Sequence, residues 1–539
     1  MASNKTPNLG MDVWAETDFF KRIELNGNFT KLDTKAKENS DKIVDLSTSI
    51  NDIAINTKGR GAKGDGTADE TSIFSSLVTS LGVSESTILI PPGTFRFKQN
   101  FTFPENIKLQ FSKGAKLSVD SGFTVTIKGE IIAGNHVIFT GSGDIDKSTS
   151  PTPYNVAWYE GVSLNKKWDK MAARFNDFIQ KNIIVPKPYP NQVGAINPTS
   201  EVNRWYWKLD APLTINDYCS LAKIYFEGEL YAPTNIGTGV VFGLTPTKPE
   251  TIHLPLGISV QGDSTNRLSI GIEVRTIARL IINGIVDVNN ADKGMVIGGA
   301  NHNGNIGVIE VDSFHCGFAK GAGIEIYGKG GSYSLNNILF KQVLIENNSI
   351  TGQDAVVVKG ATRQIKIASL FYLTNLGSNC KSVFVVQNTT EGTPISTMVD
   401  MVYSNNGDDY AVRTEDLVGG AGQVIDMLSI SNVYTVGNGV SLYGTKSAFI
   451  KNVASGSAIY IDSTCIYTQL EVTNRSRSIT DNGTLSVING LGKRNYAVGA
   501  TPDTTQWTIG NLVWNSSDNT VWVKVKETGV SANDFIKLN

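Results

Sequence analysis

A repeat between residues 255 and 485 is the feature that most constrains the fold of this chain. Paired blocks rich in β-branched residues recur, and each holds a strand, a polar Asn, Asp or Gly turn and another strand. Equivalent strands are expected to start near residues 295, 324, 356, 384, 411, 440 and 459. A period of about 20–50 residues is typical of solenoids, whose repeats bury their inward side chains against one another. Because no helical pattern intervenes, the repeat predicts a mainly β fold, a parallel β-helix, rather than a leucine-rich or helical repeat.

Length, charge and cysteine usage exclude several classes of protein. The 539 residues can bury a large core over several domains, and the net charge of −2 gives no sign of a nucleic-acid-binding surface. Four cysteines stand singly, which indicates buried thiols rather than a disulfide framework: Cys219, Cys316, Cys380 and Cys465. Residues 1–20 lack a signal-peptide pattern, and no apolar run approaches the roughly 18 residues of a membrane-spanning helix. We therefore expect no membrane insertion, and release from the host cell by lysis.

Residues 59–97 predict how the solenoid begins. A glycine-rich turn, GAKGDG, leads to Asp69, which is well placed as a helix N-cap. A short amphipathic helix that ends at Gly82 is expected next. Its apolar face consists of Ile73, Leu77, Val78 and Leu81. A buried strand at 87–90 and the segment PPGTFRF at 91–97 follow.

This order resembles the beginning of pectate-lyase-like right-handed β-helices, in which a GAKGDG turn, a capping helix and a PxGTY turn open the solenoid. The resemblance covers residues 59–97. It implies a right-handed parallel β-helix, with its cap and first rungs at 57–150. It implies no particular chemistry, because that fold carries lyases, hydrolases, epimerases and adhesins.

The N-terminal residues carry a second resemblance. The element LNGNFTKLD at 25–33 is similar to the start of many tail fibres and appendages of phages that infect Gram-positive bacteria. The resemblance implies that residues 1–28 attach the chain to a virion, with collar or tail proteins as partners of residues 1–55. It also implies a location in the phage tail, and an extracellular one after host lysis.

A heptad pattern follows this element. Its positions alternate in steps of three and four, at Phe29, Leu32, Ala36, Asn39, Ile43, Leu46, Ile50 and Ile53. Such spacing predicts an α-helical coiled coil over 29–56, in which the polar Asn39 could fix register and oligomeric state. A single surface-packed helix is the alternative. The heptad alone is compatible with a dimer, whereas the resemblance to trimeric tail spikes favours a homotrimer.

Residues 151–250 break the strand pattern. A segment with a helical period contains Trp168, Met171, Ala172, Phe175, Phe178 and Ile179, and prolines follow it at 186, 188 and 190. We interpret 151–250 as a mixed insertion that packs on the side of the solenoid. Trp205 and Trp207 in its aromatic cluster are candidates for binding substrate, because aromatic faces can stack on sugars. The alternative is that these rings anchor the insertion.

The remaining chain divides into a β-helix body at 251–490 and a C-terminal segment at 491–539. That segment reads as short antiparallel strands and resembles the small C-terminal modules of phage fibres. We expect a small β domain that binds carbohydrate or caps a trimer. Its tryptophans, which are expected mostly in its core, are Trp507, Trp514 and Trp522.

Acidic residues of the body are the candidate catalytic groups. Alignment of the blocks places four of them near the same strand, rung after rung: Asp287, Glu310, Asp312 and Glu346. Neighbouring rungs lie about 4.8 Å apart. Acids on adjacent rungs can therefore meet the carboxylate separations of a glycosidase, about 5–5.5 Å for retention and about 6.5–9.5 Å for inversion. Ordinary solvated side chains are the alternative interpretation.

Arg275, His302 and His315 are the remaining candidates for binding substrate. The two histidines lie in loop-like segments near the acidic strand and could act as acid or base. A structural role is the alternative for each of them. No His or Cys spacing indicates a metal or a cofactor, and a divalent cation is left open.

Together these features predict a phage tail appendage or tail spike. It is expected to bind host cell-wall glycan, either teichoic acid or a surface polysaccharide, and to hydrolyse it with paired carboxylates in a groove of the β-helix. A non-enzymatic receptor-binding adhesin with the same fold is one alternative. A secreted polysaccharide lyase is another.

Overall fold

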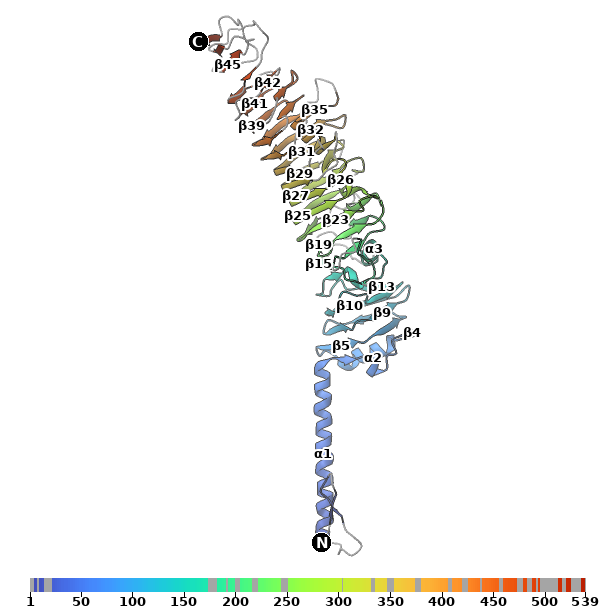
Figure 1. Cartoon of the computed structure of the whole chain (residues 1–539). Coiled ribbons are helices and arrows are strands. Elements are labelled where there is room, and N and C mark those ends of the chain that lie inside the picture. The colour runs from blue at the N-terminus through green and yellow to red at the C-terminus, as the bar shows by residue number, and fades with distance from the viewer. Residues whose placement is uncertain are drawn as a thin grey trace. The chain divides into compact units, whose positions relative to one another are not determined.

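The computed structural model forms two compact units, Met1–Thr152 and Pro153–Asn539. Figure 1 traces their helices and strands by label. The residues that the structure describes are 4–6, 9–13, 22–172, 182–190, 192–198, 204–215, 222–243, 251–302, 304–330, 335–346, 353–373, 380–405, 410–418, 425–436, 439–454, 459–472, 478–481, 487–490, 493–494, 512–515, 520–524 and 535–538. Side chains are described within these ranges up to residue 471, apart from residues 12 and 47–53.

The first unit winds around three short parallel sheets. Successive strands of the chain enter the three sheets in turn, which is the topology of a β-helix. Its strands are β3 (Ile55–Asn56), β4 (Asp65–Asp69), β5 (Ser86–Ile90), β6 (Gly93–Phe97), β7 (Phe101–Phe103), β8 (Ile107–Phe111), β9 (Ala115–Val119), β10 (Thr124–Ile127), β11 (Ile131–Ile132), β12 (Phe139–Gly141) and β13 (Asp144–Asp146). The strict alternation of buried and exposed residues in β8 directs every second side chain into the core.

Helix α2 (Thr71–Leu81) occupies the place that the sequence predicts, but its buried face differs. The buried apolar side chains are Phe74 and Leu77, whereas Ile73 is half-buried. Phe74 packs its ring against Phe95 and Phe97, with ring centroids 6.0 and 5.1 Å apart. The face turned toward these aromatic rings therefore decides what is buried, since a Phe side chain gains about 1.5–3 kcal/mol when it is fully covered.

The predicted N-cap of α2 lies one residue too early. Glu70 occupies the cap position and makes no side-chain cap bond. The Asp69 carboxylate instead accepts hydrogen bonds from the backbone N–H groups of Thr71 and Lys98, at 3.0 and 3.3 Å. Asp69 thereby ties the start of the helix to Lys98, the residue that follows β6.

Helix α1 (Arg22–Ile53) begins seven residues before the first heptad position and ends at the last one. At about 1.5 Å per residue it is roughly 48 Å long. Three of its described heptad side chains are exposed in the single chain, to 59% at Phe29, 67% at Ile43 and 61% at Leu46. The helix that the heptad requires is therefore present, and pairing between chains remains a prediction.

The second unit contains two long sheets whose strands are almost all parallel. The 12-stranded sheet consists of β18 (Leu213–Ile215), β21 (Thr238–Phe242), β24 (Leu268–Val274), β26 (Ala291–Gly298), β28 (Ile324–Gly328), β30 (Asp354–Gly360), β32 (Ser382–Asn388), β35 (Tyr410–Asp416), β38 (Val440–Leu442), β40 (Ile459–Ile461), β42 (Ser478–Asp481) and β44 (Lys493–Arg494). The 19-stranded sheet consists of β14 (Tyr154–Asn155), β15 (Asn182–Val185), β16 (Ala195–Ile196), β17 (Tyr206–Lys208), β19 (Ala222–Phe226), β20 (Leu230–Ala232), β22 (Thr251–Leu254), β23 (Gly257–Gly262), β25 (Ile277–Asn289), β27 (Ile306–Gly317), β29 (Leu335–Glu346), β31 (Thr362–Leu373), β33 (Ile395–Val399), β34 (Val402–Ser404), β36 (Asp426–Ile430), β37 (Val433–Thr435), β39 (Ala448–Ala454), β41 (Thr468–Val472) and β43 (Val487–Gly490). Figure 1 shows these strands stacked from β15 to β42.

The larger sheet covers two faces of the solenoid. The first half of β25 pairs with β22 and its second half with β23, so the strand bends between the two. Further along, β33 and β34 take the same two places against β31. Face A is the side formed by the first halves of the long strands; it contains β22, β33, β36 and residues 277–282, 306–311 and 335–340. Face B is the side formed by the second halves of the long strands; it contains β23, β34, β37 and residues 285–289, 313–317, 342–346 and 369–373. Face C is the 12-stranded sheet.

The repeat predicted from the sequence is confirmed on face C. One buried column of side chains runs through seven strands in register: Met295, Ile324, Val356, Phe384, Val412, Val440 and Ile459. Six of the seven predicted strand starts coincide with this column, and the seventh, at 411, is one residue early. The fold class is therefore the predicted one, a mainly β chain with a parallel β-helix.

Residues 151–250 contribute strands to the stack, rather than forming an insertion beside it. β15 pairs with β19 and β19 with β22, while β18 and β21 lead into face C. Helix α3 (Leu164–Ala172) buries Trp168 and Met171, whereas Phe175, Phe178 and Ile179 lie outside the described residues. The strands were missed because they are only three to five residues long and prolines and aromatic residues separate them.

The C-terminal segment contains an antiparallel sheet, as predicted. Its strands are β45 (Leu512–Asn515), β46 (Thr520–Lys524) and β47 (Phe535–Leu538). Trp514 and Trp522 lie in the first two strands, and Trp507 lies outside the described residues.

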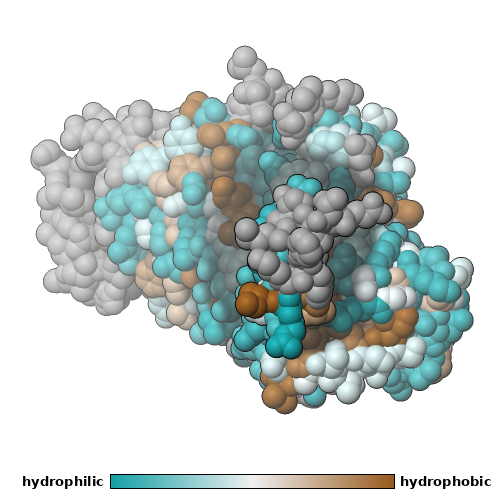
Figure 2. Space-filling model, turned by 90° about the horizontal axis from the view of Figure 1, so that it is seen from below, coloured by the Kyte–Doolittle hydropathy of each residue, from teal (hydrophilic) through white to brown (hydrophobic). Residues whose placement is uncertain are grey.

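On the face seen in Figure 2, hydrophilic residues surround smaller hydrophobic patches among the described residues. No described helix combines the length and apolar content that crossing a membrane requires. Cys316, Cys380 and Cys465 are buried, as predicted, and Cys219 lies outside the described residues. Burial raises the pKa of Cys316 to about 12.

Candidate functional site

One outward column on face B brings polar and aromatic side chains into register. Strand pairing aligns seven residues from β23 to β37: Ser259, Asp287, His315, Leu344, Phe371, Tyr403 and Tyr434. Their neighbours along each strand, such as Val286 and Val288, are buried. Because side chains alternate between the two sides of a strand, the column faces outward. We call it the face B column.

His315 bridges two carboxylates at one end of this column. Its Nδ1 lies 2.7 Å from Asp287 Oδ1, and its Nε2 lies 2.9 Å from Glu346 Oε1. The three side chains come from β25, β27 and β29 and are 30%, 25% and 36% exposed, in the order Asp287, His315, Glu346. The Asp287–His315–Glu346 cluster is therefore ordered by hydrogen bonds and still open to a ligand.

Asp287 is held by a second set of hydrogen bonds. The Asn289 side-chain amide donates to both Asp287 oxygens, at 3.0 and 3.1 Å, and the Ser259 hydroxyl lies 3.4 Å from Oδ2. Gly317 makes room for this arrangement, because a Cβ at that position would lie 2.3 Å from the Asn289 amide oxygen. Neighbouring strands thus fix the orientation of the carboxylate.

The electrostatics of the cluster favour a charged imidazole. The hydrogen bond to Asp287 raises the pKa of His315, as do the charges of Asp287 and Glu346, while burial opposes them. A protonated imidazole donates from both nitrogens, which matches a ring with a carboxylate on each side. The two accepting oxygens, separated by one ring and two hydrogen bonds, lie roughly 7 Å apart, within the about 6.5–9.5 Å range of inverting glycosidases.

Aromatic side chains continue the face B column beyond the cluster. The rings of Phe371 and Tyr403 have centroids 6.1 Å apart at an interplanar angle of 49°. Tyr403 and Tyr434 are exposed. Since neighbouring strands are about 4.8 Å apart, the column from Asp287 to Tyr434 is roughly 24 Å long. It offers an extended polymer a row of aromatic faces that leads to the cluster.

The structure does not place all four predicted acids on one ladder. Strand register makes His315 the equivalent of Asp287, 28 residues later, so neither Glu310 nor Asp312 stacks on Asp287. Glu310 lies on face A and pairs with Arg279 at 3.3 Å. Asp312 lies at the bend between faces A and B and pairs with Lys341 at 2.5 Å. The predicted ladder is wrong for these two residues because each block bends across two faces.

Three predicted substrate-binding residues lie away from the cluster. Trp207 is fully buried and its indole N–H donates to the Pro186 carbonyl at 2.7 Å, so it anchors the fold instead of binding a sugar. His302 is also buried and therefore has no surface to offer a ligand. Arg275 follows β24 on face C and pairs with Glu273 at 2.7 Å.

Trp205 and His315 are the other two residues that the sequence predicts to bind substrate. Trp205 is half-buried and directly precedes β17, whereas the cluster lies on β25, β27 and β29. His315, which the sequence placed in a loop-like segment, lies within β27 at the centre of the cluster.

Sequence reasoning missed Asn289 and the aromatic part of the face B column. The spacing of Phe371, Tyr403 and Tyr434 follows the repeat, so alignment of the blocks position by position contains the signal. Asn289 is found only through its hydrogen bonds to Asp287.

No metal site emerges from the described residues, in which no group of three or more His, Cys, Asp or Glu side chains could hold an ion. In the cluster, the carboxylates occupy both ring nitrogens of His315.

Comparisons with known proteins give similar folds. No protein-family model matches the sequence, and no curated protein is similar to it. Among solved structures, the chain is similar to an exopolygalacturonase from Thermotoga maritima, with 14% identity, 74% of this chain and 92% of the other covered, and a TM-score of 0.25. The chain is also similar to PfbA, a surface adhesin of Streptococcus pneumoniae, with 12% identity, 90% of this chain and 98% of the other covered, and a TM-score of 0.20. A third similar structure is the A-module of a mannuronan C-5 epimerase from Azotobacter vinelandii, with 12% identity, 81% of this chain and 98% of the other covered, and a TM-score of 0.23. Similarities this low assign no function to this chain.

Proposed function

We propose that this chain is a tail spike or tail appendage of a phage, which binds a host surface polysaccharide along the face B column and hydrolyses it at the Asp287–His315–Glu346 cluster. The observation that carries the proposal is the pair of carboxylates held on either side of His315, at the end of a row of aromatic rings. A polymer laid across successive rungs contacts both parts of the surface.

We assign different roles to the two acids. Asp287 is held in place by hydrogen bonds from Asn289, Ser259 and His315, so we assign it as the base that takes a proton from the attacking water. Glu346, the more exposed acid, accepts from His315 Nε2 and passes the imidazolium proton to the departing glycosidic oxygen. Asp287 then releases the proton of the attacking water to solvent, and His315 regains its proton from solvent, so the cycle is balanced.

The bond that suits this site is glycosidic. A phosphodiester of teichoic acid would bring negative charge against two carboxylates, and charges of the same sign repel one another. A polysaccharide without phosphate avoids that repulsion and also gains from the aromatic faces. We therefore favour surface polysaccharide over teichoic acid as the substrate.

The test follows the release of reducing ends from purified Gram-positive wall polysaccharide. Asp287→Asn and Glu346→Gln should each lower the rate by at least about 100-fold, the usual contribution of a general acid or base. Glu310→Gln and Asp312→Asn are matched controls, since they remove equally acidic side chains outside the cluster and should leave the rate within a factor of about two. Equal loss in all four variants, or release of phosphate-linked fragments from teichoic acid, would contradict the assignment.

An adhesin without turnover is the second candidate, and the aromatic part of the face B column favours it. Tyr403 and Tyr434 can bind glycan without any reaction at the cluster. Binding of polysaccharide without release, unchanged by Asp287→Asn and Glu346→Gln but weakened by Tyr403→Ala, would support this candidate.

Attachment and assembly belong to the same proposal. The chain forms a homotrimer through the heptad residues of α1, whose apolar side chains are exposed in the single chain. Residues 1–55 join the collar or tail of the virion, which is supported by the resemblance of residues 25–33 to phage tail fibres.

A further inference from the structure

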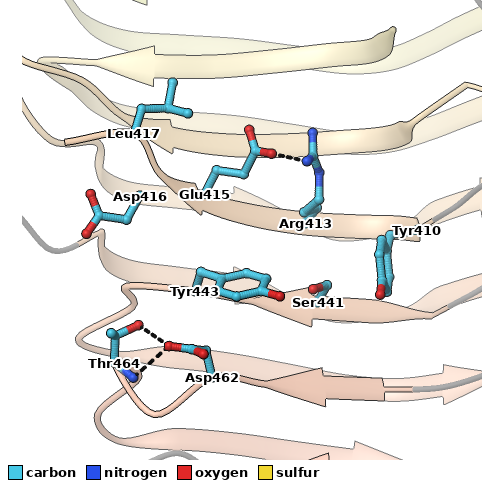
Figure 3. Close-up of a pocket in the computed structure, with 9 residues that line it drawn as sticks. All are labelled: Tyr410, Arg413, Glu415, Asp416, Leu417, Ser441, Tyr443, Asp462 and Thr464. Carbon is cyan, nitrogen blue, oxygen red and sulfur yellow. Dashed lines mark hydrogen bonds and ion pairs between the residues drawn. The ribbon is translucent and has the colours of Figure 1, made fainter. Parts of the chain in front are cut away.

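A pocket of about 400 Å³ opens on face C, where β35, β38 and β40 lie side by side. Figure 3 shows its lining, which combines aromatic, acidic and hydroxyl side chains. The residues that matter most here are Tyr410, Arg413, Asp416, Tyr443 and Asp462. None of them belongs to the face B column or to the cluster. Pockets of this size, with a few fixed polar groups, commonly bind small ligands or single units of a polymer.

Tyr443 offers the aromatic wall of this pocket. Its side chain is exposed, and its ring packs against Tyr460, with centroids 5.3 Å apart at 37°. The buried Thr414 hydroxyl contacts the Tyr443 backbone twice, at 2.7 Å from the N–H and 2.8 Å from the carbonyl oxygen. The ring is therefore held in place before any ligand arrives, which lowers the entropic cost of binding.

The Asp462 carboxylate offers a fixed hydrogen-bond acceptor beside Tyr443. Its carboxylate accepts hydrogen bonds from the Thr464 N–H at 3.0 Å, the Thr464 hydroxyl at 2.8 Å and the Tyr460 hydroxyl at 3.1 Å. Burial acts to raise the pKa of Asp462, but these hydrogen bonds outweigh it and the pKa is lowered. The group is thus a charged acceptor that points along the pocket wall (Figure 3).

Asp416, at the end of β35, provides a second acceptor, two strands away from the Asp462 end of β40. The Asn388 amide donates to it at 2.7 Å and the Val418 N–H at 3.0 Å. Asp416 also leaves little space at Gly444, in the turn after β38, because a Cβ on Gly444 would lie 3.3 Å from the Asp416 Cβ.

Among the described residues of the lining, Arg413 is the only cation, and it is already neutralised. The buried Arg413 guanidinium donates to both oxygens of Asp354, at 2.9 and 3.0 Å, and also pairs with Glu415. It also donates to the Ser382 hydroxyl at 2.7 Å. The charge left facing the pocket is that of acidic side chains, which disfavours an anionic ligand.

We infer that this pocket is a second saccharide site, which holds a pyranose ring that carries no anionic group. The apolar face of the sugar lies on Tyr443, and its hydroxyls donate to Asp462 and Asp416. Charge-assisted hydrogen bonds of this kind are about twice as strong as neutral ones. The inference rests on the proposed function only in its choice of a glycan as ligand, and it requires no hydrolysis.

The experiment measures binding without turnover, by isothermal titration calorimetry on the full chain. The probes are trisaccharides of glucose, galactose and N-acetylglucosamine, with the trisaccharide of galacturonic acid as the anionic counterpart. The chain carries Tyr403→Ala and Tyr434→Ala, so that binding to face B does not contribute to the signal. At least one neutral trisaccharide should bind, and galacturonic acid at least tenfold more weakly.

Two variants in this background locate the site. Tyr443→Ala and Asp462→Asn should each weaken binding at least tenfold, whereas Tyr189→Ala, which removes an exposed tyrosine outside the pocket, should not change it. Asp462→Asn keeps the shape of the side chain and so tests the charge in a chain that folds. Absence of binding by every neutral probe, or affinity unchanged in both variants, would overturn the inference. A hydrolysis rate unchanged in Asp287→Asn and Glu346→Gln would refute the proposed hydrolysis and leave this binding result untouched, so the two proposals fail separately.

Discussion

At the scale of single residues, His315 decides how the cluster works. Both of its ring nitrogens face carboxylates, and the ring is only a quarter exposed. The proton that it carries therefore stabilises the folded chain and also supplies the proposed reaction. Both roles depend on pH in a direction that the pKa shift fixes.

His315 should titrate above the ordinary histidine value of 6.5. A raised folded-state pKa contributes stability that is fully present below the unfolded pKa and is lost as pH rises through the folded pKa. We therefore expect the unfolding free energy to fall as pH rises from 6.5 through the His315 pKa, and His315→Gln to remove that part of the pH dependence. An NMR titration of the imidazole protons measures the value directly, and a pKa at or below 6.5 would refute the charged bridge.

Gly317 should be essential for the bracing of Asp287. Gly317→Ala places a methyl group 2.3 Å from the Asn289 amide oxygen, and overpacking of this kind costs about 1–3 kcal/mol. Asn289→Ala removes the clash, so the double variant should recover most of the loss. Denaturant unfolding of the two single variants and the double variant measures this coupling. Purely additive effects would show that the two positions do not interact.

At the scale of secondary-structure elements, α1 presents a stripe that the single chain leaves exposed. Steps of three and four place Phe29 and Ile43 at position a of the heptad, and Leu32 and Leu46 at position d. Burial of such side chains between helices is the driving force of a coiled coil. Val44 is as exposed as Leu46, at 59% against 61%, but lies off the stripe at position b.

Leu46→Glu should convert the proposed homotrimer to monomers, because three charges would meet in the core of the bundle. Val44→Glu, which adds the same charge outside the stripe, should leave the oligomer intact. Sedimentation equilibrium of both variants measures the result. A wild-type chain that sediments as a monomer, or equal dissociation by both variants, would exclude the coiled coil.

At the scale of the whole molecule, every residue of the cluster comes from one chain. The hydrogen bonds among Asp287, His315 and Glu346 need no partner subunit. Assembly through α1 and chemistry on face B are therefore separable.

A monomeric Leu46→Glu variant should retain the hydrolysis rate per chain within a factor of about two. Reducing-end release at equal chain concentration measures it, beside the wild-type chain. A rate that falls with dissociation would place part of the site between subunits.

Removal of residues 1–53 should leave a folded chain that no longer joins virions. The cut spares β3, where Ile55 is buried and pairs with Ile88 of β5. Circular dichroism and thermal unfolding measure the fold, and incorporation into particles measures attachment. Truncated protein that still assembles onto virions would show that attachment lies elsewhere.

The sequence by itself determined the repeat and the strands that express it. The column through Met295 and Ile324, and strands such as β8, follow from alternation of buried and exposed side chains, which is a local property of the chain. The helix predicted from the heptad also follows from a local property of the chain, because the spacing of the heptad residues matches the turn of an α-helix.

Only the tertiary structure decided which acids meet. Asp287 and Glu310 look equivalent along the chain, but a bend between faces A and B turns them to different sides, and the 28-residue step places His315 on Asp287. Trp207 looks like a platform for sugar, yet the strands around it bury it completely. Register and burial arise from contacts between residues far apart in the chain, which is the physical reason that periodicity predicts the strands and does not predict the site.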